Sequence, residues 1–206
     1  MPVNRFLAVV ASLPAIVFAI QADGQDNIPL SFKEQQEVVR RVEAAKSYRQ
    51  AAVIDADKRI YVVDLWAYEM RRAKPPRRMA EVLHFKYEGG ETIRTTYDLN
   101  AHKVVKVEKL QAYPTPLAAQ ELTVAIEVAR QNDHRVETLF GEDNESVLTE
   151  LLVPIIADKN SPRFGHRIAK LMFRANPDAV ETVSVEVDLT DSKLIVVPGS
   201  SSPEKK

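Results

Sequence analysis

The chain has 206 residues, of which 45% are hydrophobic, and its 28 Lys and Arg against 29 Asp and Glu leave a net charge of −1. This balance gives no overall field of the kind that draws a protein to nucleic acid or to an anionic membrane. The absence of cysteine excludes disulfides, thiolate metal sites and a cysteine nucleophile.

The N-terminus predicts export. Arg5 precedes an apolar run, Phe6 to Ile20, of roughly 15 residues, whereas a helix that spans a bilayer needs about 20. Small residues at Ala19 and Ala22 offer two cleavage sites. We therefore expect a signal peptide at residues 1–22 and a secreted or periplasmic protein, with an uncleaved anchor and a buried N-terminal helix as alternatives.

The next segment predicts a helix followed by an antiparallel meander. Ser31 and Glu34 form a capping-box pattern at the start of a helix over residues 30–45. Segments rich in Val, Ile, Tyr and Thr follow, and in one of them Ile93, Thr95 and Tyr97 alternate onto a single face. The predicted strands cover residues 48–55, 59–72, 77–87, 92–100 and 103–110.

The second half of the chain has the same order of elements. Thr115 is predicted to cap a helix over residues 117–132, with Pro116 in its first turn, and a shorter helical segment ends at Gly141. Strands are predicted at residues 147–156, 166–176, 180–190 and 193–197, before a disordered tail at residues 199–206.

The two halves also resemble each other in sequence. The segment from Arg78, RMAEVLHF, parallels RIAKLMFR from Arg167, and Asp98-Leu99 parallels Asp188-Leu189. We therefore predict an α+β fold of two tandem domains, each a helix packed on an antiparallel sheet, at residues 28–112 and 113–198.

This collinear pattern, over roughly residues 30–197, resembles the N-terminal region of copper amine oxidases. Members of that family carry two small cystatin-like domains, their second and third N-terminal domains, ahead of a catalytic β-sandwich domain. The family hairpin has Gly, which suits a turn with a positive φ, where this chain has His102 and Ser192. His tolerates that conformation better than most residues and Ser less well, so the departure leaves the exact turn open and does not affect the predicted fold.

The catalytic motifs of that family are missing from this sequence. There is no Asn-Tyr-Asp/Glu motif to form the quinone and no His-x-His pair for copper, and His84, His102, His134 and His166 are each solitary. The resemblance therefore implies a protein that is not an enzyme, with no cofactor, no metal and no catalytic residue.

One surface cluster is a candidate binding site. Five basic residues around a Pro-Pro turn would contact an anionic partner, although a solvated hairpin loop that discourages edge pairing is the simpler interpretation. They are Arg71, Arg72, Lys74, Arg77 and Arg78.

Other patterns have structural explanations. Trp66 and Tyr68 suit core packing better than an exposed platform, and the acidic pairs Asp55 with Asp57 and Glu142 with Asp143 lie in predicted turns. Asn144 fits a glycosylation acceptor.

The sequence thus predicts a secreted binding or accessory protein whose partner is an amine oxidase chain, without nucleic acid or a transmembrane span. One alternative is a divergent or partial member of the copper- and quinone-dependent primary-amine oxidases. A second is a protease modulator of the cystatin or PepSY kind, although the cystatin-type Gln-x-Val-x-Gly segment is absent.

Overall fold

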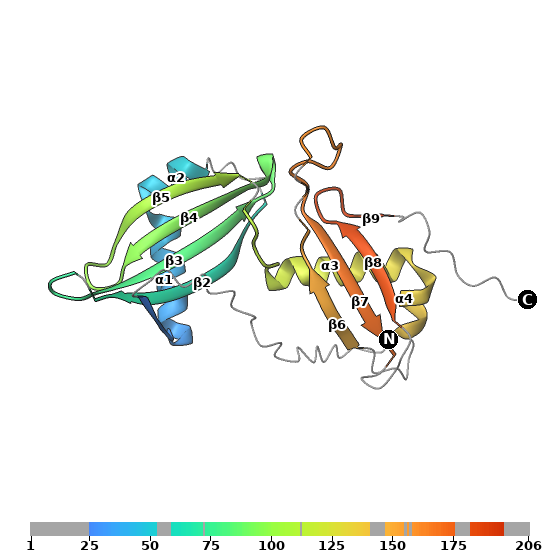
Figure 1. Ribbon diagram of the computed structural model, residues 1–206, viewed down its shortest axis with the longest axis horizontal. Coiled ribbons are helices and arrows are strands. Elements are labelled where there is room, and N and C mark those ends of the chain that lie inside the picture. The colour runs from blue at the N-terminus through green and yellow to red at the C-terminus, as the bar shows by residue number, and fades with distance from the viewer. Residues whose placement is uncertain are drawn as a thin grey trace, which may run out of the picture.

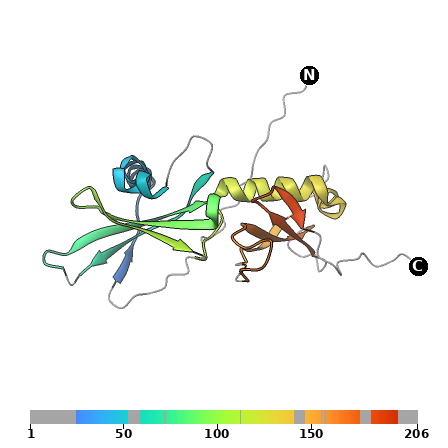
Figure 2. The ribbon, with the colours of Figure 1, turned by 90° about the horizontal axis from the view of Figure 1, so that it is seen from above.

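The computed structural model describes residues 25–52, 59–71, 73–111, 113–140, 147–154, 156, 158–175 and 182–195. Its strands form two antiparallel sheets, one of five and one of four strands, and helices cover one face of each (Figures 1 and 2). The predicted α+β class, with a helix on an antiparallel sheet in each unit, is confirmed. The elements are β1 (Gln25–Ile28), α1 (Phe32–Ala44), α2 (Lys46–Ala52), β2 (Ile60–Met70), β3 (Arg77–Lys86), a 3₁₀ turn (Glu88–Gly90), β4 (Glu91–Asp98), β5 (Lys103–Gln111), α3 (Ala119–Asn132), α4 (His134–Leu139), β6 (Val147–Leu152), β7 (Ile168–Arg174), β8 (Val183–Asp188) and β9 (Lys193–Ile195).

Several predictions fall outside the described residues. They are the signal peptide, the C-terminal tail, Arg72, Gly141, Asn144 and both acidic turn pairs. Among the described helices, none has the length and apolar character needed to cross a bilayer. The domain boundaries and the ancestry of the repeat stay predictions.

The N-terminal unit, α1 to β5 with β1 at its edge, packs two helices on a sheet of order β1-β2-β3-β4-β5. The predicted capping box at the start of α1 is present, and Val38 and Val42 face the sheet one turn apart. The prediction of a strand at residues 48–55 is wrong for residues 48–52, which are helical, and residues 53–55 lie outside the described residues. After a break at Ala45 the chain continues as α2, because that conformation buries both Tyr48 and Ala52 on one face.

The strand β1 was not predicted, because it has only four residues and three of them are polar. It pairs antiparallel with the end of β2, from Gln25 opposite Met70 to Ile28 opposite Ala67. The four predicted strands of the meander are present and pair with their sequence neighbours. Ile93 and Tyr97 lie in the core under the helices, as the alternation predicts.

The C-terminal unit, α3 to β9, places α3 and α4 on a sheet of order β6-β7-β8-β9. The prediction that Thr115 caps this helix is wrong, because α3 begins at Ala119 with Ala118 at the cap position. The hydroxyl of Thr115 instead accepts a hydrogen bond of 2.7 Å from Arg167. A side chain with a buried partner elsewhere is not available to cap a helix.

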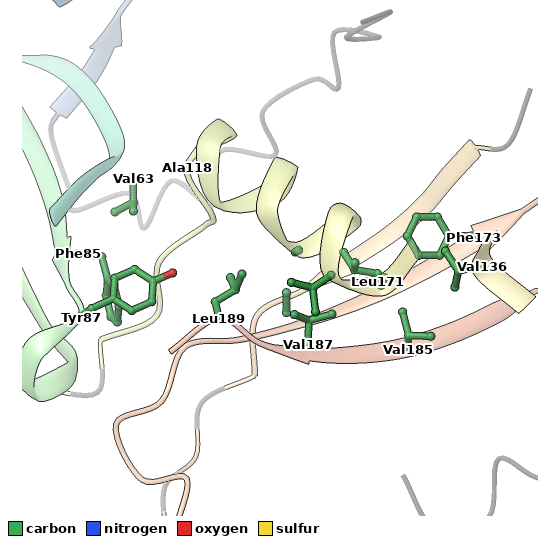
Figure 3. Packing of buried hydrophobic residues seen from close by; sticks show 14 of the residues in the cluster. Val63, Phe85, Tyr87, Ala118, Val136, Leu171, Phe173, Val185, Val187 and Leu189 are labelled. Carbon is green, nitrogen blue, oxygen red and sulfur yellow. The ribbon is translucent and has the colours of Figure 1, made fainter. Parts of the chain in front are cut away.

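One hydrophobic cluster joins the two units. It runs from Val63, Phe85 and Tyr87 in the N-terminal unit to the core between α3 and the second sheet, where Leu171 and Phe173 are fully buried (Figure 3). The two units are therefore packed together rather than connected only through the chain between β5 and α3.

Candidate functional site

The predicted basic cluster lies where β2 turns into β3. Of its residues, Arg71 lies 3.5 Å from Glu69 through its Nε, and Lys74 and Arg77 are exposed. This turn is at the end of the N-terminal unit that points away from the C-terminal unit (Figure 1). Binding of an anionic partner by this cluster stays a prediction.

Arg78, the last residue of the cluster, reaches the start of α1. Its Nη2 lies 3.7 Å from the carboxylate of Glu34, which also accepts a 2.9 Å hydrogen bond from the Ser31 backbone N–H. The backbone and hydroxyl of Ser31 hold the pKa of Glu34 below its ordinary value. Both side chains of the pair are well exposed, 39% for Arg78 and 44% for Glu34.

The C-terminal unit repeats this arrangement in a buried form. Glu121 accepts a 2.7 Å hydrogen bond from the Ala118 backbone N–H, and its carboxylate lies 3.1 Å from both Nε and Nη2 of Arg167. Only 4% of the Arg167 side chain and 1% of the Glu121 side chain are exposed. Removal of one partner from a buried, hydrogen-bonded ion pair of this kind lowers the free energy of unfolding by several kcal/mol, because the other charge is left buried without a partner.

All five N–H donors of Arg167 are engaged. Besides the two bonds to Glu121, Nη1 donates to the carbonyl and hydroxyl oxygens of Thr115 and Nη2 donates to the Pro116 carbonyl. The pair therefore fixes the chain that leads into α3, and no donor remains for a ligand.

Further contacts match between the two units. In each unit, the leucine that follows β4 or β8 donates its backbone N–H to the backbone carbonyl of the arginine, Arg78 or Arg167. The backbone N–H of that arginine donates to the side chain of the residue after the leucine. In each, an aspartate carboxylate accepts two turn N–H groups, and a non-glycine residue has a positive φ. The pairs are Leu99 with Leu189, Asn100 with Thr190, Asp98 with Asp188, and His102 (52°) with Ser192 (54°).

The near end of the first sheet covers the Arg167–Glu121 pair through Phe85 and Tyr87. Figure 3 shows these two rings on the side of Leu189. The guanidinium of Arg167 lies 4.3 Å from the centroid of the Phe85 ring, a cation–π geometry. The hydroxyl of Tyr87 donates a 2.7 Å hydrogen bond to Glu121. Burial, together with this bond to a carboxylate, raises the pKa of Tyr87, so the phenol stays a donor at neutral pH.

Arg59 and two glycines complete the junction. The guanidinium of Arg59 donates to the carbonyls of Leu189 and Thr190, at 3.0 and 2.8 Å, and lies over the Tyr87 ring. Gly90, three residues after Tyr87 in the chain, lies directly against the backbone of Gly165. The junction is thus held by aromatic, ionic and backbone contacts together.

A small cavity of about 50 Å³ opens beside these contacts, lined by residues of both units that include Phe85, Thr115, Phe164 and His166. That volume holds only a few water molecules. Its size excludes the drug-sized ligands that ordinary binding pockets enclose.

One group of side chains in the described chain has the spacing of a metal site. Ligand atoms of His166, Asp188 and Asp191 lie within 4.8 Å of one another. Their hydrogen bonds are already made: Asp188 accepts from His166 at 2.7 Å and from two turn N–H groups, and Asp191 pairs with Lys193. Since Asp98 accepts the same two turn bonds in the N-terminal unit, the turn explains Asp188 without a metal.

The histidines do not fit the copper site of the oxidase family. His84 is buried in the N-terminal unit against Tyr48, His102 is exposed in the turn after β4, and His134 is exposed on α4. His166 is bonded to Asp188. Within the described residues, no group of potential ligands contains two histidines.

The two aromatic residues Trp66 and Tyr68 form no exposed platform. Tyr68 is buried, with its hydroxyl 3.4 Å from Glu81, and Trp66 packs against the hydrophobic cluster of the junction. The expectation of core packing is confirmed for Tyr68, whereas Trp66 is half-buried and also lines a groove with Leu30 and Gln35.

Arg78 belongs to a basic cluster that is visible in the sequence, whereas its counterpart Arg167 does not. Arg167, Glu121 and Tyr87 are far apart in the chain, and none belongs to a charge cluster. One signal was present: the alignment of the two segments places Arg167 opposite Arg78, and each helix has a glutamate three residues after its cap.

Comparison with known proteins gives a likeness in structure alone. No known family matches the sequence, and no curated protein does. The fold is similar to a crystal structure of a copper-containing benzylamine oxidase from Hansenula polymorpha, at 12% sequence identity and a TM-score of 0.51. The match covers 81% of this chain and 28% of the oxidase chain, so this chain is similar in fold to a part of a copper amine oxidase.

Proposed function

We propose that this chain is a non-catalytic binding or accessory protein that is exported and associates with an amine oxidase chain. The observation that carries the proposal is the extent of the fold likeness, 81% of this chain against 28% of the oxidase. An accessory role is supported because the likeness takes in both packed units and the sequence lacks the motifs for copper and quinone.

The chemistry of the described residues supports the same proposal. The strongest candidates for reactive groups, the Arg167–Glu121 pair and the His166–Asp188 pair, are engaged in hydrogen bonds that hold the junction and a turn.

Association is tested with the purified protein and the amine oxidase of the same organism. We expect a complex that elutes ahead of either protein in size-exclusion chromatography at micromolar concentrations. Two separate, unshifted peaks would refute the partner. Export is tested separately, by cell fractionation and N-terminal sequencing of the protein, where an intact N-terminus in the cytoplasm would count against it.

The fold likeness also favours a second candidate, a divergent or partial member of the copper- and quinone-dependent primary-amine oxidases. Metal analysis and quinone staining of the purified full chain distinguish the two. We expect neither copper nor stain, because the sequence has no His-x-His pair and no Asn-Tyr motif. Copper with a positive stain would replace the accessory role by the enzymatic one.

A further inference from the structure

The far end of the N-terminal unit has the contact set that the C-terminal unit buries, yet it is exposed. Glu34 and Arg78 occupy the places of Glu121 and Arg167, and Asn100 occupies that of Thr190. In the C-terminal unit this set is a docking surface, since Phe85, Tyr87 and Arg59 at the near end of the first sheet contact it. We call the exposed counterpart, formed by Phe32, Glu34, Arg78, Leu99 and Asn100, the distal surface.

The covered counterpart shows which chemistry fits such a surface. An aromatic ring lies against the arginine, a phenol hydroxyl donates to the glutamate, and a guanidinium donates to the two turn carbonyls. On the distal surface the matching groups are Arg78, Glu34 and the carbonyls of Leu99 and Asn100. A partner edge with an aromatic ring and hydrogen-bond donors would meet all of them.

Two features of the distal surface favour a partner over plain solvent. Phe32 is 73% exposed, more than any other large hydrophobic residue in the described chain, and aromatic residues, Phe among them, are enriched at the centres of protein interfaces. The neighbouring Lys33, Lys74 and Arg77 are exposed, whereas Glu34 and Glu69 are each paired with an arginine. The surface is therefore positive, and a partner that carries carboxylates is favoured.

We infer that the distal surface docks the amine oxidase chain, through an edge that presents an aromatic ring and a hydrogen-bond donor flanked by carboxylates. This inference rests on the proposed function and adds the place of contact. The ring lies over Phe32 and the Arg78 guanidinium, the donor reaches Glu34, and the carboxylates face the basic turn between β2 and β3.

The inference is tested by measuring the affinity of four variants of the full chain for the amine oxidase of the same organism. Phe32→Ser and Arg78→Ala change the distal surface at exposed positions. Arg49→Ala on α2 and Val124→Ser on α3 are matched controls, because both residues are exposed and lie outside that surface. Circular dichroism establishes that each variant is folded before binding is measured.

We expect the two distal variants to weaken binding at least tenfold, and the two controls to leave it unchanged. Equal binding by all four variants would overturn the distal surface while the proposed function stands. Absence of binding by the wild-type chain would overturn both. Binding to vesicles of phosphatidylglycerol that the distal variants abolish, with no effect of these variants on oxidase binding, would assign the surface to lipid instead.

Discussion

The backbone of Gly90 lies against that of Gly165 so closely that a Cβ on Gly90 would be 2.5 Å from the Gly165 carbonyl oxygen and 2.9 Å from its Cα. Gly90 also has a φ of 59°. These two glycines bring the turn between β3 and β4 against the loop that precedes β7, and thereby set the distance between the two units.

Gly90→Ala is therefore expected to separate the units, because backbone on both sides leaves the methyl group no room. Gly89→Ala is the matched control: its φ is also positive, but its Cβ would meet only the flexible Glu91 side chain at 3.6 Å. Each change costs about 1 kcal/mol for the positive φ, and Gly90→Ala costs more. Chemical unfolding and small-angle scattering measure the two effects, and equal values for both variants would contradict the close approach.

Arg167→Met is expected to lower the free energy of unfolding by about 3–5 kcal/mol, because it leaves the buried Glu121 carboxylate without its partner. Arg78→Met removes the matching exposed arginine and should cost less than about 1 kcal/mol. Urea unfolding of the two variants measures the difference. Similar costs would show that burial at the junction contributes little to the pair.

The capping box of α1 predicts a pH dependence. Hydrogen bonds from Ser31 lower the pKa of Glu34 from its ordinary 4.5, so the folded state binds this proton more weakly than the unfolded state. The stabilisation by ionised Glu34 is therefore complete above about pH 4.5 and is lost as the pH falls through the folded pKa. Thermal melts should show that Glu34→Gln is less stable than wild type at pH 6.5 and that this difference shrinks as the pH is lowered below 4.5. A constant difference would exclude this titration.

His84→Phe is expected to preserve or raise stability at neutral pH. Neither ring nitrogen of His84 makes a hydrogen bond, although the side chain is 1% exposed; its Nε2 lies 3.5 Å from a carboxylate oxygen of Glu43. A buried polar atom without a hydrogen bond is destabilising, and a contact at this distance offsets little of that cost. The Phe ring can keep the contact with Tyr48, whose ring centroid is 4.5 Å away. His166→Phe is the contrasting variant, since it breaks the bond to Asp188 and should lower the melting temperature. A lower melting temperature for His84→Phe would reveal a needed polar contact.

His102→Gly is expected to leave the fold intact and to change stability by less than about 1 kcal/mol. His102 is exposed and already has the left-handed φ of 52° that glycine adopts without strain. A thermal melt checks this, and loss of the cooperative transition would show that the imidazole makes a needed contact.

Local patterns predicted much of this fold. The Ser31–Glu34 cap and the alternation around Ile93 depend on neighbours within a few residues, so the sequence displays them directly. The composition of residues 48–55 predicts a strand because β-branched and aromatic residues favour strands, whereas burial of Tyr48 and Ala52 on one helix face decides the structure of residues 48–52.

The junction was not predictable in the same way. Thr115 has the residue type and position expected of a helix cap, but its hydroxyl accepts a hydrogen bond from Arg167, 52 residues later in the chain. The bond from Tyr87 to Glu121 depends on the packing of one unit on the other. Contacts of this kind exist only in the assembled fold, and no short-range pattern encodes them.

The two arginines also differ in how freely evolution can replace them. Exchange of Arg167 leaves a buried carboxylate and several acceptors unmatched, so relatives of this chain should retain arginine there whatever they bind. Stability places little demand on Arg78, so relatives that use the surrounding surface should retain it and relatives that do not should have lost it. In an alignment of such relatives, the residue found at the position of Arg78 would therefore show whether the exposed end of the molecule has been under selection.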